Sequence, residues 1–325
     1  MKTEDVRQMY EQHPYPSPIV GDSLIHDLAN AIGMLFPDDT LAGWNVLDAG
    51  CGTGHRLVSF AQRYPAARFT GVDMTEHSLA VARQLARKHG VSNLELRRGD
   101  LLNLELGQKY DLIVSTGVLH HLEDPEAGLR GLVEHLSEEG LLFVWLYHSH
   151  GEHQRLLDRE LARTLTRGCD MAESVSLMRE LGLSLSRKQY GTETAHQGSE
   201  GELSQVSIDV DAFLHPIVNA YRFDELLDML RRTSVDWVTL NGLNTEGASK
   251  LVDLEGTSED PYFCITDEQL FASSLLQERF RQLPRLDRVR VIELALRPTG
   301  FTLLAGKGQS FRRCEPRVAT NIVHP

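Results

Sequence analysis

The strongest constraint on the fold is a glycine turn near residue 50. Residues 45–60 read NVLDAGCGTGHRLVSF: a β-branched and apolar run contains Asp48, and glycines then stand at positions 50, 52 and 54. An amphipathic helical pattern follows directly. A strand, a tight turn and a helix in this order leave free helix N–H groups at the end of the strand, where nucleotide-like ligands bind. The turn therefore predicts an α/β fold with a nucleotide-like ligand.

Strand-like and helix-like patterns alternate from residue 22 to residue 147. Glycines 90 and 140 are predicted to end two of the helices. Alternating strands and helices with short connections predict a doubly wound, mostly parallel sheet with helices on both faces. The predicted strands are 45–50, 68–73, 94–100, 110–116 and 141–147, and the predicted helices are 55–64, 76–90 and 125–140.

The regular alternation stops after residue 150. Two further strands, 235–243 and 300–308, complete a seven-stranded sheet with helical insertions after strands five and six. Residues 190–210 are polar and are predicted to form a loop. A separate C-terminal domain from about residue 150 is the alternative. The predicted organisation is an N-terminal arm and helix (1–40), a ligand-binding core (41–150), a helical and loop insertion (151–221), completion of the core with a second insertion (222–310) and a tail (311–325).

Composition and charge limit the functional class. The chain has 41% hydrophobic and 24% charged residues, which is ordinary for a globular protein, and its four cysteines form no CxxC pair. We expect no signal peptide and no membrane span, and hence a cytoplasmic protein. The net charge of −13 disfavours a phosphate-backbone binder. Arg312, Arg313 and Arg317 could form a basic patch, but a solvated tail is the preferred interpretation.

The spacing of the glycines favours a cofactor other than a dinucleotide. A dinucleotide fingerprint places its third glycine at position 55, which here is His55, and no GK[ST] of a phosphate loop follows. Asp48 would repel a pyrophosphate but suits a ligand with a cationic end. The helix N–H groups would accept a carboxylate. A ligand with an amine, a carboxylate and an adenosine is S-adenosylmethionine.

Two later strand ends support this cofactor. Asp73, 19 residues after Gly54, could accept both ribose hydroxyls. Asp100 ends the third strand, where its carboxylate could accept the adenine amino group, with Met74 and Leu101 on either side of the ring. Each acid alone is more typical of a loop or a helix cap. Three of them at successive strand ends favour a single adenosine-containing ligand.

The sequence at this point resembles the class I (seven-stranded, Rossmann-like) methyltransferases, of the type 11/12-like branch. The resemblance rests on VLDAGCGTG, GVDMTEHSLAVAR, GDLLNL and YDLIVSTGVLHHLEDPEAGLRGLVEHLSEEGLLFV, and more weakly on FTLLAGKG. It implies S-adenosylmethionine as cofactor and S-adenosylhomocysteine as product. The contacts that it implies fall on Asp48, Gly50, Gly52, Gly54, Asp73, Met74, Asp100, Leu101 and Thr116.

Candidate substrate residues lie outside this core. MYEQHPYPSP (9–18) and DAFLHPIVNAYRFDELLDML (211–230) resemble segments of the same branch. Prolines 14, 16 and 18 impose an extended segment that could hold Tyr10 and Tyr15 over the cofactor as a lid, or that could pack them on the sheet edge. Asp211, His215 and Tyr221 form a polar and aromatic cluster that could contact a substrate. His215 could instead cap the helix that begins near Arg222.

The segment STGVLHHLEDP (115–125) supplies the candidate base. Methyl transfer is an in-line displacement that needs a base only when the nucleophile arrives protonated. His120 and His121 are the candidates, with a packing role as the alternative. The segment lacks the [DN]PP[YF] motif of amide- and exocyclic-amine-modifying relatives. His148, His150 and His153 could bind metal, but a solvated loop is preferred, and no metal is predicted.

The leading hypothesis is a methyltransferase that acts on a small or medium-sized organic molecule, within a chain that could form a homodimer. An RNA- or protein-modifying methyltransferase and a non-catalytic cofactor-binding regulatory subunit are the alternatives. His55 in place of the third glycine disfavours a nicotinamide-dependent oxidoreductase.

Overall fold

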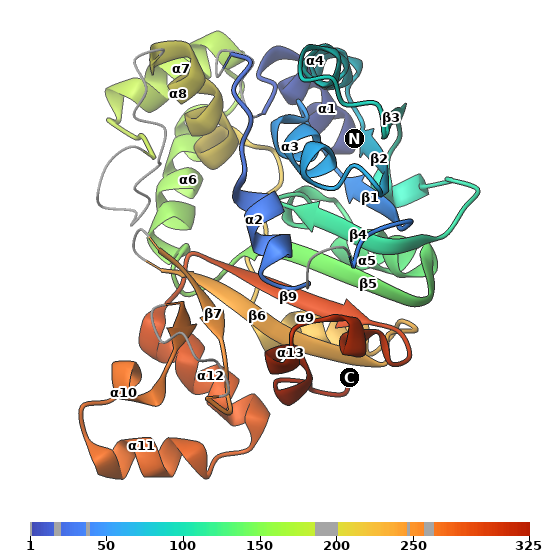
Figure 1. Cartoon of the computed structure of the whole chain (residues 1–325). Coiled ribbons are helices and arrows are strands. Elements are labelled where there is room, and N and C mark those ends of the chain that lie inside the picture. Colours follow the sequence, from blue (N-terminus) through green and yellow to red (C-terminus); the bar gives the residue numbers. More distant parts are fainter. Residues whose placement is uncertain (1, 16–20, 37–39, 186–200, 246–247, 257–262) are drawn as a thin grey trace.

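The computed structural model describes residues 2–15, 21–36, 40–185, 201–245, 248–256 and 263–325, and these form an α/β fold around one sheet (Figure 1). The described strands follow the order β3-β2-β1-β4-β5-β9-β6-β7-β8. Parallel pairs join the first five, and β9 runs antiparallel to both β5 and β6. The strands are β1 (Asn45–Ala49), β2 (Arg68–Asp73), β3 (Leu94–Arg98), β4 (Tyr110–Thr116), β5 (Leu136–Tyr147), β6 (Trp237–Thr245), β7 (Ala248–Val252), β8 (Cys264–Ile265) and β9 (Gly300–Gly306).

Helices cover both faces of the sheet, as expected for a sheet in which parallel strands are joined by crossover helices. One face packs its core against α2, α3 and α13, through residues such as Ile32, Phe60 and Val318. The other face packs against α5, α9 and α12, through Leu132, Leu227 and others. These helices are α2 (Asp27–Gly33), α3 (His55–Arg63), α5 (Pro125–Glu134), α9 (Phe223–Leu230), α12 (Arg285–Leu296) and α13 (Pro316–Thr320), and α4 (Glu76–Lys88) follows β2.

The two insertions are separate groups of helices (Figure 1). The first follows β5 and contains α6 (His153–Leu165), α7 (Met171–Glu180), α8 (Gly201–Asp209) and a π-helical turn at Val210–Leu214. It has its own small core, which includes Met9 of α1 (Lys2–Gln12) as well as Met178 and Phe213. The second follows β6 and contains β7, β8, α10 (Asp267–Leu270), α11 (Ser274–Arg281) and α12. Packing of α1 against the first insertion brings the N-terminal residues close to a segment 200 positions away.

The structure confirms the α/β class and corrects several details. The described sheet has nine strands, because β7 and β8 of the second insertion extend it beyond β6. Strand β5 begins at Leu136, so Gly140 lies within a strand and α5 ends earlier, at Glu134. The late strands β6 and β9 pair within the same sheet as β1 to β5.

Two predictions about surface segments are wrong for the residues that the structure describes. The predicted loop 190–210 is helical from Gly201 to Asp209, while residues 190–200 lie outside the described residues. The C-terminal segment is not a solvated tail, because Arg317 is buried and donates to the Asn241 side chain. Arg313 pairs with Glu139. None of the described helices is both long and apolar enough to cross a membrane.

Candidate active site

A cavity of about 460 Å³ opens at the carboxyl ends of β1, β2, β4 and β5 and extends over β6 and β7. This edge is where parallel α/β sheets bind their ligands. Its lining joins the glycine turn to residues of α1, α2 and the first insertion. Of the predicted residues, the lining contains Tyr10, Tyr15, Asp48, Gly50, Gly52, Asp73, Met74, Asp100, Leu101, Thr116, His121 and Asp211. Gly54, His120, His215 and Tyr221 are outside it.

The glycine turn has the backbone geometry that its sequence predicts. Gly50, Gly52 and Gly54 all have positive φ, at 88°, 53° and 79°, a region that side chains disfavour. A Cβ at Gly50 would lie 2.4 Å from Val118, and one at Gly54 would lie 2.6 Å from Ala82 of α4. Gly54 therefore provides the close helix packing that a dinucleotide fingerprint assigns to its third glycine.

His55 has a structural role that its sequence position did not reveal. Its ring is fully buried, with Nδ1 2.8 Å from the Thr53 hydroxyl and Nε2 3.1 Å from the Gly21 carbonyl. The Thr53 N–H also donates to the Tyr15 carbonyl. These contacts attach the N-terminal segment to the glycine turn, and so place Tyr15 at the cavity.

Asp48 is the buried acid of the turn. It is 3% exposed, and within the described chain no hydrogen bond reaches its carboxylate. Its pKa is raised to about 7, chiefly by burial, with the charge of Arg56 opposing the shift and that of Asp73 adding to it. A buried carboxylate that lines a cavity without a partner is matched by a cationic ligand group.

Asp73 and Asp100 are held by the backbone. Asp73 accepts hydrogen bonds from the Gly52 N–H at 3.0 Å and from the Thr75 N–H and hydroxyl. Asp100 accepts from the Leu102 N–H and so caps the short 3-10 helix Leu101–Asn103. Both carboxylates still line the cavity, and each retains an oxygen that can accept a further bond, Oδ2 in the case of Asp73.

Arg56 is a site residue that the sequence analysis missed. It lies on the first turn of α3, lines the cavity, and its Nε lies 3.0 Å from both oxygens of Asp27 on α2. It places a guanidinium beside the glycine turn, where a ligand carboxylate is expected. Its position directly after the turn was the only available signal.

The two adjacent histidines have different surroundings. His120 is fully buried, stacks on Tyr147 at 3.9 Å, and its Nδ1 accepts the Tyr147 N–H. His121 lines the cavity, and its Nδ1 lies 2.8 Å from the Ile217 carbonyl. Since a carbonyl can only accept, the Nδ1 of His121 carries the proton and Nε2 presents a lone pair.

Burial keeps His121 neutral. Its pKa is lowered chiefly by burial, which outweighs the opposing effect of Asp211. Arg155 and Arg159 of α6 lower the pKa further. These arginines, with Arg163, donate to the carbonyls of Ala212, His215 and Pro216, one after another along the segment that carries Asp211. Helix α6 thus positions that segment against His121.

His121, Asp211 and His215 form the one group of possible metal ligands found among the described residues. The rings of His121 and His215 stack at 3.8 Å, and His215 Nδ1 accepts the Ile217 N–H. A neutral His215 then carries its proton on Nε2, so that neither nitrogen offers a free lone pair. The hydrogen bonding disfavours a metal site here.

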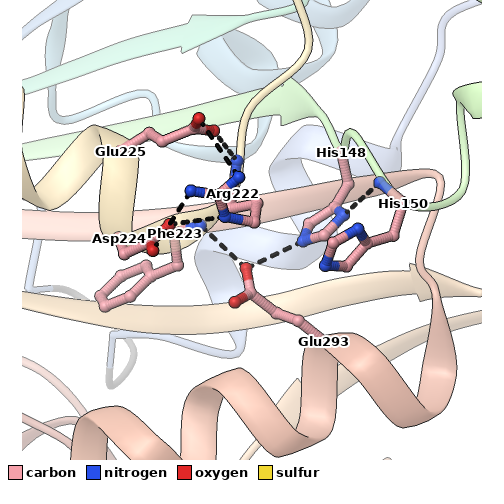
Figure 2. Close-up of polar contacts among 7 residues, drawn as sticks. All are labelled: His148, His150, Arg222, Phe223, Asp224, Glu225 and Glu293. Atoms are coloured by element: carbon pink, nitrogen blue, oxygen red, sulfur yellow. Dashed lines mark hydrogen bonds and ion pairs between the residues drawn. The ribbon is translucent and has the colours of Figure 1, made fainter.

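His148 and His215 serve the fold, whereas His153 is exposed. His148 is fully buried, its Nε2 donates to Glu293 of α12 at 2.8 Å, and its Nδ1 accepts the His150 N–H (Figure 2). Glu293 also accepts the Phe223 N–H at 2.8 Å. The preferred interpretation of a solvated loop is therefore wrong for His148, which joins the end of β5 to the second insertion.

His215 does not cap α9, because Glu225 accepts the Arg222 N–H there. The backbones of Tyr221 and His148 form a parallel β-bridge, and Tyr221 does not line the cavity.

Comparison with known proteins agrees with this geometry. A family model described as a methyltransferase domain matches residues 41–199. An uncharacterized Synechococcus protein, syc1184_c, is 30% identical over 254 residues, which cover 77% of this chain and 56% of that protein. Trans-aconitate 2-methyltransferase of Deinococcus radiodurans is 35% identical over 130 residues, 39% of this chain and 47% of the enzyme. This chain therefore spans about half the length of these relatives.

The structural likeness extends beyond the matched domain. PKMT2 of Rickettsia typhi superposes with a TM-score of 0.59 at 17% identity, over 87% of this chain and 52% of that one. At this identity the likeness concerns the fold alone. The chain therefore contains a methyltransferase domain, matched over residues 41–199, and its strand order and glycine turn are those of the class I S-adenosylmethionine-dependent methyltransferases.

Proposed function

We propose that this protein transfers the methyl group of S-adenosylmethionine to a small or medium-sized organic molecule, with His121 as the general base. The observation that carries the proposal is a single cavity that joins the glycine turn to a neutral histidine whose Nε2 is free to accept a proton.

The residues of the turn fit the cofactor. Asp48 supplies a buried carboxylate for an ammonium group, and Arg56 supplies a cation for a carboxylate. Asp73 and Asp100 retain acceptor capacity for ribose and adenine, while Met74 and Leu101 line the same wall. S-adenosylmethionine would supply an electrophilic methyl group on a sulfonium.

The chain's own residues would bind, orient and deprotonate the acceptor. Val6 and Tyr10 of α1 line the cavity together with Tyr15, which favours the exclusion of water. Prolines 16 and 18 of the predicted extended segment lie outside the described residues. We propose that this arm acts as a lid. His121 would accept the acceptor's proton as the new bond forms, and His120, which does not line the cavity, would support the ring of Tyr147.

A small acceptor is favoured over a nucleic acid by the charge of the lining. It contains five aspartates but two cationic side chains, Arg56 and Lys250. Arg56 pairs with Asp27 and lies where the cofactor carboxylate is proposed, which leaves Lys250 as the one cationic side chain of this lining for an acceptor. A phosphate backbone is bound by several cations. RNA- or protein-modifying activity and a non-catalytic role have no comparable support from the cavity.

The test is methyl transfer from S-[methyl-³H]adenosylmethionine to a mixed panel of small amines, phenols, alcohols and carboxylic acids. We expect label in at least one small acceptor and its loss in His121→Ala. Cofactor binding without label in any acceptor, or labelling of added RNA alone, would contradict the proposal.

A further inference from the structure

In the substrate half of the cavity, two hydrogen-bond acceptors, Asp211 and Nε2 of His121, face each other with no hydrogen bond between them. Asp211 Oδ1 lies 3.9 Å from Nε2 of His121. Because Nδ1 of the neutral His121 ring donates its proton to the Ile217 carbonyl, Nε2 carries no proton. Among the described residues, Asp211 receives one hydrogen bond, from the Tyr10 hydroxyl at 2.7 Å. Its carboxylate therefore has acceptor capacity that the protein does not use.

Two such acceptors require a ligand that donates more than one hydrogen. A phenol or an alcohol carries a single O–H, which could reach one of the two atoms only. A carboxylate carries none and would be repelled by Asp211. A protonated primary or secondary amine has two or three N–H donors and a positive charge, so it can satisfy both acceptors at once.

The surroundings give the same preference. The two arginines whose charges act on His121, Arg155 and Arg159, donate to backbone carbonyls and are absent from the cavity lining. The cavity lining also includes the aromatic side chains of Tyr10, Trp145 and Tyr147; the Tyr10 hydroxyl contacts Asp211, and the rings of Trp145 and Tyr147 lie edge to face at 5.5 Å. The indole of Trp145 is fixed by a 2.6 Å hydrogen bond from its Nε1 to Asn244. Such a wall accommodates an apolar or aromatic body attached to the charged group.

We infer that the methyl acceptor is an amine, bound as its ammonium form between Asp211 and His121, with its carbon skeleton against Tyr10 and Trp145. This inference rests on the proposed function. The ammonium loses a proton to Nε2 of His121, and the freed nitrogen lone pair forms the bond to the methyl carbon. The methyl–sulfur bond breaks with its electron pair on sulfur, which leaves S-adenosylhomocysteine and a methylated ammonium. His121 then releases the proton to solvent.

The first test compares isosteres on the unaltered protein. Protein saturated with S-adenosylhomocysteine would be titrated calorimetrically with phenethylamine, 2-phenylethanol and phenylacetate. We expect the amine to bind at least tenfold more tightly than the other two. Equal binding of the alcohol, tighter binding of the carboxylate, or no binding of the amine to the loaded protein would overturn the inference. Failure to bind S-adenosylhomocysteine would instead overturn the proposed function.

The second test uses Asp211→Asn with Asp228→Asn as a matched control. Asp228 lies on α9, with a side chain that is 60% exposed. Asp211→Asn should weaken phenethylamine binding at least tenfold while S-adenosylhomocysteine still binds, and the control should change neither. An Asp211→Asn variant that binds both ligands normally would overturn the inference. If the variant does not fold, the isostere comparison on the unaltered protein still tests the inference.

A third test separates the sources of the amine. Tritium transfer would be measured to phenethylamine and to an N-acetylated hexapeptide with one internal lysine. Transfer to the free amine supports a small-molecule acceptor, and transfer to the peptide alone supports the same amine chemistry on a protein side chain. Transfer to phenols or carboxylates in preference to both would contradict the amine assignment.

Discussion

The cofactor half and the substrate half of the cavity are built in different ways. In the cofactor half, the polar groups follow successive strand ends within one stretch of the chain, from Asp48 to Thr116, and backbone N–H groups hold Asp73 and Asp100. In the substrate half, Tyr10, His121 and Asp211 come from α1, the loop after β4 and the first insertion. The first half depends on the turn itself, and the second depends on how distant elements pack.

A substitution in the cofactor half should therefore affect a different property from a substitution in the substrate half. A change in the cofactor half should alter cofactor affinity whatever the acceptor is. A change in the substrate half should alter turnover or acceptor affinity and leave cofactor affinity unchanged. A single substitution that changed both cofactor affinity and turnover would contradict this division of the cavity.

The largest effect is expected for His121→Ala. Removal of a positioned base typically costs about 10²- to 10⁴-fold in turnover, and cofactor affinity should be unchanged because the imidazole lies beyond the turn. His120→Ala is the matched neighbour. It should lower the melting temperature, since it empties a buried ring site stacked on Tyr147. If His121→Ala and His120→Ala lost the same amount of turnover per folded molecule, His121 would not be the base.

Asp48→Asn should weaken binding of S-adenosylmethionine by about 2–5 kcal/mol, because it removes one partner of a buried charge pair. The unliganded protein should become more stable. Burial raises the Asp48 pKa to about 7, so stability is lost as pH rises from the ordinary carboxyl pKa toward that value. Calorimetric titration and thermal unfolding near pH 8 measure the two effects. A variant that binds normally would remove Asp48 from the cofactor site.

Asp73→Ala should cost about 1.5–3 kcal/mol of cofactor affinity through lost ribose hydrogen bonds. The substitution also removes the acceptor for the Gly52 N–H, so Asp73→Asn serves as the milder comparison. Titration with S-adenosylhomocysteine checks both. Unchanged affinity would place the ribose elsewhere in the cavity.

Turnover should fall at acidic pH as His121 gains a proton. The group is active when neutral, and burial lowers its pKa below the ordinary 6.5, so the acidic limb should lie below that value. Asp211 opposes this shift, while Arg155 and Arg159 favour it. A profile of kcat against pH measures the limb. A midpoint well above 6.5 that persists in His121→Ala would exclude this histidine.

The smallest effect is expected for Arg159→Met. It removes the hydrogen bond to the His215 carbonyl and one charge near His121. We expect KM for the acceptor to rise about three- to tenfold and the acidic limb to move to higher pH, with cofactor affinity unchanged. A loss of cofactor affinity would mean that the two halves are coupled through the first insertion.

The cofactor half could be predicted from sequence because its signals are local. Glycine spacing fixes the turn, and an acid at each strand end reaches the same edge of a parallel sheet. The substrate half could be predicted only in part. Tyr10, His121 and Asp211 were candidates, but their contact depends on the packing of α1 against the first insertion. Nothing local distinguished His120 from His121 or predicted the added strands β7 and β8, and only its position directly after the turn pointed to Arg56.

The most direct test of the account is a parallel calorimetric titration of the cofactor-stripped protein with S-adenosylmethionine, S-adenosylhomocysteine and NAD. We predict micromolar binding of the first two, no heat from NAD, and loss of the binding in Asp48→Asn but not in His121→Ala. Binding of NAD alone, or binding of none of the three, would contradict the assignment of the glycine turn to S-adenosylmethionine.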